Sequence, residues 1–214
     1  MVMDVFNRLA KRYDTWYDSE KGRPLYESEL LCLRPLVAEL NAPFLEIGVG
    51  TGRFATRFPG VVGLDPAFGA LRMASMRGVP PVLGVGEKLP FNDGSFGGVL
   101  IILTLCFVKN PVEALKESWR VLTQGGGLIL GTIPKDSDWG AFYWRKNKEN
   151  NPFFEKLKLY TMKETERMIK NTGFRIEKIR STLLQPPQDK SFVEEPCNTY
   201  MKKAGFICLL SKKI

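Results

Sequence analysis

The chain has 214 residues, 44% of them hydrophobic and 25% charged, and these proportions are those of one globular domain. Its formal net charge is +8, and it contains no histidine. The lack of histidine removes the most common general base and metal ligand, so hydrolases with a Ser–His or Cys–His pair are excluded and we expect no metal site. No run of about 18 apolar residues and no signal-peptide pattern occurs, so we expect a cytoplasmic protein without a membrane partner.

Hydrophobic spacing and turn residues divide the chain into alternating helices and strands. In chain order we expect helices at residues 4–19 and 24–40, a strand at 44–48, a short helix at 53–58, a strand at 61–65, a helix at 66–76, strands at 81–85 and 96–105, a helix at 110–122, a strand at 128–133, a helix at 161–173, and strands at 174–182 and 205–210. This alternation predicts an α/β fold with a doubly wound, mostly parallel sheet, which binds ligands at the carboxyl ends of its strands.

Residues 135–160 show no clean period and are rich in aromatic residues and lysine. We expect them to form an insertion over the carboxyl edge of the sheet.

The most informative segment is a glycine-rich turn directly after the first predicted strand. Glu46 stands two residues before Gly48, and Gly50 and Gly52 follow at alternate positions. Glycines allow backbone angles closed to other residues and let a ligand contact the main chain. A dinucleotide fingerprint would need its third glycine where the chain has Arg53. The acidic Glu46 favours a cationic ligand and would repel a pyrophosphate.

This E-x-G-x-G-x-G arrangement resembles motif I of the class I S-adenosylmethionine (SAM)-dependent methyltransferases. Asp65 after the second predicted strand, residues 86–96 and residues 120–127 are similar to later motifs of that family, and residues 13–23 resemble a cap over the cofactor. The resemblance is to the small-molecule branch, of the ubiquinone and menaquinone biosynthesis type. It implies a Rossmann-like sheet of about seven strands, mostly parallel with the last strand antiparallel, and helices on both faces.

The resemblance further implies a single methyltransferase domain over residues 1–214. In that domain, residues 1–40 would form an N-terminal helical cap and residues 135–160 a cover over the substrate.

SAM, and its product S-adenosylhomocysteine (SAH), would then lie at the strand ends and beneath the cap. Asp65 would accept hydrogen bonds from the ribose hydroxyls, because a carboxylate can accept two bonds from a diol. The residues expected to contact SAM are Tyr13, Trp16, Arg23, Glu46, Gly48, Gly50, Thr51, Gly52, Asp65, Pro66, Gly86, Glu87, Lys88 and Thr104. Candidates for the wall of the acceptor pocket are Tyr17, Cys106, Phe107 and Tyr143.

No catalytic residue is predicted, because methyl transfer from a sulfonium is an in-line displacement that depends on the position of the acceptor. An amine or a thiolate attacks unaided, whereas a hydroxyl needs a base or a metal. A chain without histidine therefore favours a small-molecule amine, or another ready nucleophile, as the acceptor.

Three other functions stay open. A non-catalytic SAM-binding protein is one, because Val85 and Gly97 stand where family members usually carry acidic residues. An RNA methyltransferase is a second, less favoured one: residues 1–134 carry 14 Lys and Arg and 13 Asp and Glu, so most of the excess positive charge lies in residues 135–214. An NAD(P)-dependent oxidoreductase is the third, against which Arg53 argues. The sequence carries no signal for an oligomeric state.

Overall fold

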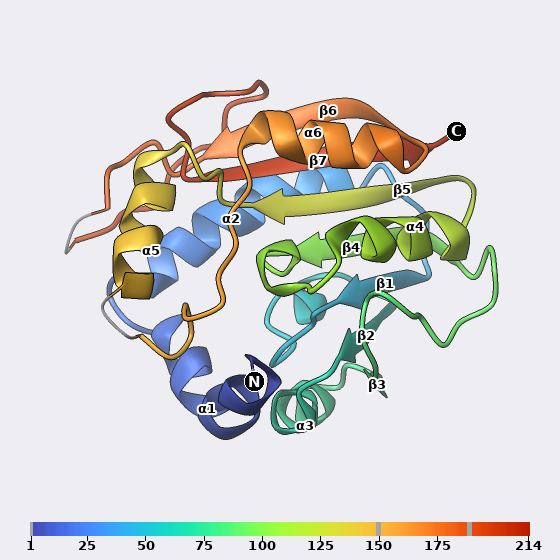
Figure 1. The fold of residues 1–214 in the computed structure, drawn as a ribbon, viewed down its shortest axis with the longest axis horizontal. Helices are drawn as coiled ribbons and strands as arrows, with labels where there is room; N and C mark the ends of the chain where they lie inside the picture. The colour runs from blue at the N-terminus through green and yellow to red at the C-terminus, as the bar shows by residue number, and fades with distance from the viewer. Residues whose placement is uncertain (1, 149–150, 188–189) are drawn as a thin grey trace.

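A computed structural model describes residues 2–148, 151–187 and 190–214 (Figure 1). Within them, seven strands form one sheet in the order β3-β2-β1-β4-β5-β7-β6. The strands are β1 (Phe44–Ile47), β2 (Val61–Asp65), β3 (Pro81–Leu83), β4 (Phe96–Ile102), β5 (Leu122–Thr132), β6 (Phe174–Thr182) and β7 (Phe206–Lys213). The first five pair in parallel, and β7 is antiparallel to both of its neighbours. The predicted fold class is confirmed.

Both faces of the sheet are buried, and β4 shows how one strand contributes to each. Its residues are all buried, and because side chains alternate along a strand, successive residues join different clusters. Leu100 and Ile102 pack in the cluster that contains Leu30 and Leu33 of helix α2 (Gly22–Val37). Val99 and Ile101 pack in the cluster on the other face, with side chains from helices α4 (Pro111–Val121) and α6 (Met162–Asn171).

The caps of α4 and α6 follow from local sequence patterns, in which Asn110 precedes Pro111 and Thr161 stands three residues before Glu164. Asn110 accepts a hydrogen bond from the Glu113 N–H at 3.4 Å, with Pro111 in the first turn. Thr161 and Glu164 form a reciprocal capping box, which satisfies two of the free N–H groups at the start of α6.

Two further helices frame the carboxyl edge of the sheet at its β1 and β2 end (Figure 1). Helix α3 (Phe68–Met76) follows β2, and helix α1 (Val2–Trp16) packs on α3. Ala10 of α1 lies against Ala67 and Ala70, and Asn7 accepts a hydrogen bond from the Gly69 N–H at 2.8 Å. The small residues let the two helices approach closely.

Residues 135–160 show no clean period in the sequence, yet part of this segment is a helix, α5 (Asp138–Lys148). Trp139, Phe142 and Tyr143 follow helical spacing and contact one another, with Trp139 only 2% exposed. Gly140 stands between these rings and the exposed Trp144 directly follows them, which obscures the period. Of this segment, residues 149 and 150 lie outside the described part.

Several predicted bounds also shift. The strand expected to reach residue 105 ends at Ile102, because Leu103 adopts a positive φ of 52° and a 3₁₀ turn, η2, covers Leu105–Phe107. Strand β5 begins at Leu122 rather than at 128, since its glycine run takes part in the pairing with β4 across an irregularity. The helix expected at 53–58 is a single 3₁₀ turn, Ala55–Arg57.

Among the described residues, no helix has both the length and the apolar composition that crossing a bilayer requires.

Candidate active site

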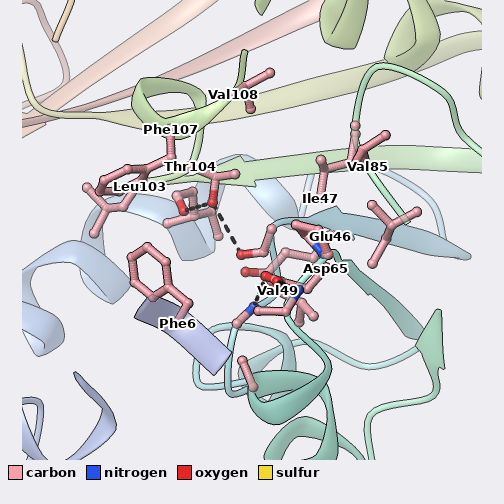
Figure 2. Close-up of a pocket in the computed structure, with 18 of the residues that line it drawn as sticks. Phe6, Glu46, Ile47, Val49, Asp65, Val85, Leu103, Thr104, Phe107 and Val108 are labelled. Carbon is pink, nitrogen blue, oxygen red and sulfur yellow. Dashed lines mark hydrogen bonds between the residues drawn. The ribbon is translucent and has the colours of Figure 1, made fainter. Parts of the chain in front are cut away.

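A cavity of about 1100 Å³ opens at the carboxyl ends of β1, β2 and β4 (Figure 2). The turn after β1 forms its floor and Phe6 of α1 lies across from that turn, pointing toward Phe107 and Leu103. This is the position at which open α/β sheets bind ligands, because the helices and loops that follow the parallel strands diverge there.

The three glycines of the turn all have positive φ, but they serve different purposes. A Cβ on Gly48 would lie 2.1 Å from a methyl carbon of Thr104, whose hydroxyl donates to the Gly48 carbonyl at 3.2 Å. A Cβ on Gly52 would lie 3.1 Å from Ala74 of α3. Gly50 has nothing within 4 Å of that point, so its backbone faces open space. Gly50 is therefore the glycine that leaves the main chain accessible to a ligand.

Asp65, at the end of β2, supports the turn from the side. Its carboxylate accepts hydrogen bonds from the Gly50 N–H at 2.9 Å and the Ala67 N–H at 2.7 Å. Burial raises the pKa of this carboxyl, and the two backbone bonds oppose the shift. The two bonds use one lone pair on each oxygen, so both oxygens keep a second one for the hydroxyls of a ligand.

Glu46 on β1 is 1% exposed, and one of its carboxylate oxygens has no hydrogen-bond partner in the described part of the chain. Burial and the nearby Asp65 both raise the pKa of Glu46. A buried carboxylate without a partner is costly unless a cation or a donor reaches it. An ammonium group delivered beside the turn would satisfy that oxygen.

The N-terminal helix is fixed to the turn through Asp14, which sequence reasoning missed. The Asp14 carboxylate accepts bonds from the Thr51 hydroxyl at 2.6 Å, from Arg53 at 2.8 Å and from Arg77 at 2.7 Å. Although burial works against it, these bonds from Arg77, Arg53 and Thr51 hold the pKa of Asp14 well below its usual range. The acidic residue inside the aromatic segment Tyr13–Tyr17 was the available signal.

Aromatic side chains form the wall opposite the turn. The Phe6 ring lies 5.4 Å from Tyr13 and 5.4 Å from Phe107 in edge-to-face contacts. The hydroxyls of Tyr13 and Tyr17 lie 3.0 Å apart. Burial raises the pKa of the Cys106 thiol to about 12, so this side chain stays a neutral thiol at neutral pH.

Most of the residues expected at the site do line the cavity. They are Tyr13, Glu46, Gly48, Gly50, Thr51, Asp65, Pro66, Gly86, Glu87 and Thr104 among the SAM candidates, and Tyr17, Cys106 and Phe107 among the acceptor candidates.

Five others lie off the cavity wall. Gly52 packs on α3, and Lys88 is exposed. Trp16 is 37% exposed and packs on Tyr17, and Arg23 lines a separate small pocket. Tyr143 lies in the aromatic cluster of α5. Residues that line the cavity but were missed include Phe6, Lys109, Asn110, Lys156 and Lys158.

Comparison with known proteins identifies the family. The profile of the family described as "Methyltransferase domain" matches residues 45–130, the stretch that holds the turn, Asp65 and β4. A solved structure from Thermotoga maritima, described as a SAM-dependent methyltransferase and possible histamine N-methyltransferase, superposes with a TM-score of 0.90. It is 34% identical and the alignment covers 99% of both chains. The chain belongs to the class I SAM-dependent methyltransferases.

Relatives without an assigned activity share most of this methyltransferase. An uncharacterized protein of Mycobacterium tuberculosis is 40% identical over 94% of this chain and 71% of its own length. One from Methanocaldococcus jannaschii is 35% identical over 99% of this chain and all of its own length. More distantly, a demethylmenaquinone methyltransferase of Renibacterium salmoninarum is 30% identical over 60% of this chain and 57% of its own. SAM is the cofactor that this family uses, and the unpaired Glu46 oxygen and the open Gly50 backbone fit it.

Proposed function

We propose that this methyltransferase transfers the methyl group of SAM to a small-molecule amine that binds in the cavity beneath α1. The observation that carries the proposal is the division of that cavity. One side consists of the turn, Glu46 and Asp65, and the other is an aromatic wall drawn from α1 and η2. Its volume of about 1100 Å³ is at the upper end for ligand sites, so a cofactor and one small acceptor can share it.

Three residues would hold SAM. Glu46 would receive the ammonium at its unpaired oxygen, and Asp65 would accept bonds from the ribose hydroxyls with its free lone pairs. Gly86 is buried at the cavity wall, where its backbone would border the adenine. This arrangement would not need an aspartate at the position of Val85.

When bound, SAM would supply an electrophilic methyl group on a sulfonium, with a neutral thioether as the leaving group. The aromatic wall would hold the acceptor nitrogen in line with that methyl and exclude water, which is where positioning lowers the barrier. An acceptor amine bound in its neutral form would donate its lone pair to that methyl group as the C–S bond breaks, and the resulting ammonium would lose a proton to solvent. The aromatic wall itself offers the neutral Cys106 and the protonated phenols of Tyr13 and Tyr17 rather than a base, so a neutral amine suits this wall better than a thiol or alcohol, which would have to lose a proton there.

The comparison with the Thermotoga maritima protein points the same way, since that protein is described as a possible histamine N-methyltransferase. We include in the proposal that residues 1–214 form one domain, with residues 1–40 as the cap and residues 135–160 as the cover. Residues 1–40 supply Phe6, Tyr13 and Tyr17 to the cavity, and the 135–160 segment supplies Lys156 and Lys158.

Titration calorimetry with SAH and with NAD tests the cofactor half. We expect saturable binding of SAH and none of NAD. Because Asp65 also supports the turn, Asp65→Asn is preferred to Asp65→Ala: the amide keeps one acceptor oxygen but loses the charge-assisted bonds. SAH affinity should fall about tenfold in that variant. Asp136→Asn, an exposed carboxylate outside the cavity, is the matched control.

Methyl transfer to histamine and to other small amines, followed as SAH formation, tests the acceptor half. Turnover of an amine supports the proposal. Saturable binding of NAD without SAH, or turnover of RNA but of no amine, contradicts it.

A further inference from the structure

Two lysines on the wall of the cavity have no acidic partner. Lys156 and Lys158 lie in the segment between α5 and α6, and both are exposed residues that line the cavity. Neither forms an ion pair with any of the described residues. Glu155 precedes Lys156 in the chain, but it does not line the cavity. The two ammonium groups can therefore meet an anion that enters the cavity.

Contacts to α1 and to η2 hold this segment against the aromatic wall, and Figure 1 shows the segment running from α1 toward the start of α6. The Phe153 ring lies 5.8 Å from the Phe6 ring and 5.6 Å from the Tyr13 ring. The Lys158 N–H donates to the Cys106 carbonyl of η2 at 2.9 Å. These contacts place the two lysines beside the rings of α1 and η2, on the acceptor side of the cavity.

The charges of the cavity are divided between its two sides. Glu46 and Asp65 stand on the cofactor side, in β1 and β2. Two further carboxylates of the lining, those of Glu87 and Glu113, already have partners in the structure. The acceptor side therefore presents positive charge without a carboxylate to neutralise it, and a cleft lined by one sign of charge attracts ligands of the other.

A third lysine of the lining, Lys109, differs from this pair. It precedes Asn110, whose N–H donates to the Glu87 carboxylate at 3.0 Å, so Lys109 stands next to a residue that holds a carboxylate at the start of α4. Lys156 and Lys158 are the lysines of the lining that lie on the segment packed against α1.

We propose that Lys156 and Lys158 bind an anionic group of the methyl acceptor, a carboxylate or a phosphate, so that the substrate is an amine that also carries negative charge. The proposal rests on the proposed function and names its substrate class. Hydrogen bonds from ammonium groups to carboxylate or phosphate oxygens are charge-assisted and stronger than those between neutral groups. An amine that carries only positive charge would instead be repelled by the two lysines.

An anionic group at this place suits the chemistry of the transfer. The reacting nitrogen has to be neutral to attack the methyl group, so its own charge cannot contribute to binding. A carboxylate or phosphate held by Lys156 and Lys158 supplies that binding energy at the other end of the acceptor. Because one end is fixed there and the rings of α1 and η2 pack along the rest, the nitrogen is left to face the cofactor half.

The test compares two pairs of amines that differ by one anionic group: histidine with histamine, and O-phosphoethanolamine with ethanolamine. Dissociation constants are measured by calorimetry on the full chain saturated with SAH at pH 7. We expect the anionic member of at least one pair to bind about tenfold more tightly than its partner, and the pair that responds shows which anion is taken. The preference should shrink as salt rises from about 0.05 M to about 0.5 M, because both lysines are exposed.

A charge reversal assigns the preference to the lysines. Both positions are exposed, so Lys156→Glu/Lys158→Glu should fold normally. In this double variant the preference for the anionic amine should disappear, while SAH affinity changes less than about twofold. Lys163→Glu is the matched control, because this exposed lysine of α6 does not line the cavity, and it should keep the preference.

The outcomes separate this inference from the proposed function. If SAH binds but neither anionic amine is preferred in the wild type, the inference is wrong, while the cofactor site stands. A preference that survives the charge reversal has the same meaning. If the reversal weakens SAH as much as the anionic amine, the two lysines belong to the cofactor half, which also contradicts the inference. If SAH does not bind to the wild type, both proposals are wrong.

Discussion

The two halves of the cavity are built in different ways. The cofactor half is made of backbone at strand ends, where Gly48, Gly50 and Asp65 are fixed by short hydrogen bonds within two adjacent loops. The acceptor half is made of side chains from α1, η2 and the segment that holds Lys156 and Lys158, which lie far apart in the sequence. The cofactor half is a rigid backbone structure that tolerates few substitutions. The acceptor half is a set of side chains, most of them aromatic or basic, which can change without disturbing the sheet.

The largest effect on the free energy of unfolding is expected at Glu29, a buried carboxyl group of α2. Between the ordinary pKa of glutamate and about 8, the folded state binds one proton more than the unfolded state at Glu29. The free energy of unfolding therefore falls as pH rises through this window and levels off above it. Glu29→Gln should be more stable than the wild type by on the order of 3 to 5 kcal/mol at pH 9 and equal to it at pH 4, by denaturant unfolding.

If the free energy of unfolding changed with pH equally in Glu29→Gln and in the wild type, Glu29 would be solvated or paired in solution. The raised carboxyls Glu46 and Asp65 contribute to both proteins and cancel in this comparison.

The next largest effect is expected at Asp14, which joins helix α1 to the glycine turn. Asp14→Ala leaves Arg53 and Arg77 facing each other without the shared carboxylate, which should lower the free energy of unfolding by about 3 kcal/mol. It should also weaken SAH binding about tenfold, because the Thr51 hydroxyl loses its acceptor. Asp18→Ala is the control: this exposed carboxylate bonds the same Arg53, so its loss should cost under about 1 kcal/mol. Similar losses of unfolding free energy and SAH affinity in the two variants would argue against the interaction of Asp14 with the glycine turn.

Two glycines of the turn sharpen the distinction between folding and binding. Gly48→Ala places a Cβ against Thr104 at positive φ, so we expect a loss of about 2 kcal/mol in unfolding free energy. Gly50→Ala meets no neighbour and should cost only about 1 kcal/mol, yet its methyl enters the cavity and should abolish SAH binding. Chemical denaturation and SAH titration measure both. Normal SAH binding by a folded Gly50→Ala would place the ligand elsewhere.

The smallest effect is expected at the tyrosine pair. Tyr13→Phe removes one hydroxyl of the 3.0 Å contact and should lower stability by about 1 kcal/mol. SAH affinity should change less than about twofold, whereas the affinity for an amine should fall. An equal loss for both ligands would mean that Tyr13 belongs to the cofactor half.

The difference between the halves also explains what the sequence could predict. The bounds of β2, the caps at Asn110 and Thr161, and most of the turn residues depend on local chemistry, and the structure has them as expected. Helix α5 is not predicted, because Gly140 interrupts its apolar spacing and the exposed Trp144 follows the aromatic residues that pack.

Asp14 and Glu29 could not be assigned because nothing local marks a carboxylate as buried. The burial of Glu29 depends on the packing of α2, and Asp14 bonds Arg77, which lies 63 residues away in the chain. Packing between residues far apart in the chain therefore determines which side chains meet in the acceptor half. The sequence alone does not show which of them will come together.

The most direct test of the two-part site is a crystal structure of the SAH complex. The account predicts the ligand's ammonium at Glu46, its ribose hydroxyls at Asp65 and its adenine beside Gly86, with the space toward Tyr13 and Tyr17 left for an acceptor. A ligand seated against the aromatic wall of α1 and η2, with Glu46 and Asp65 untouched, would contradict it.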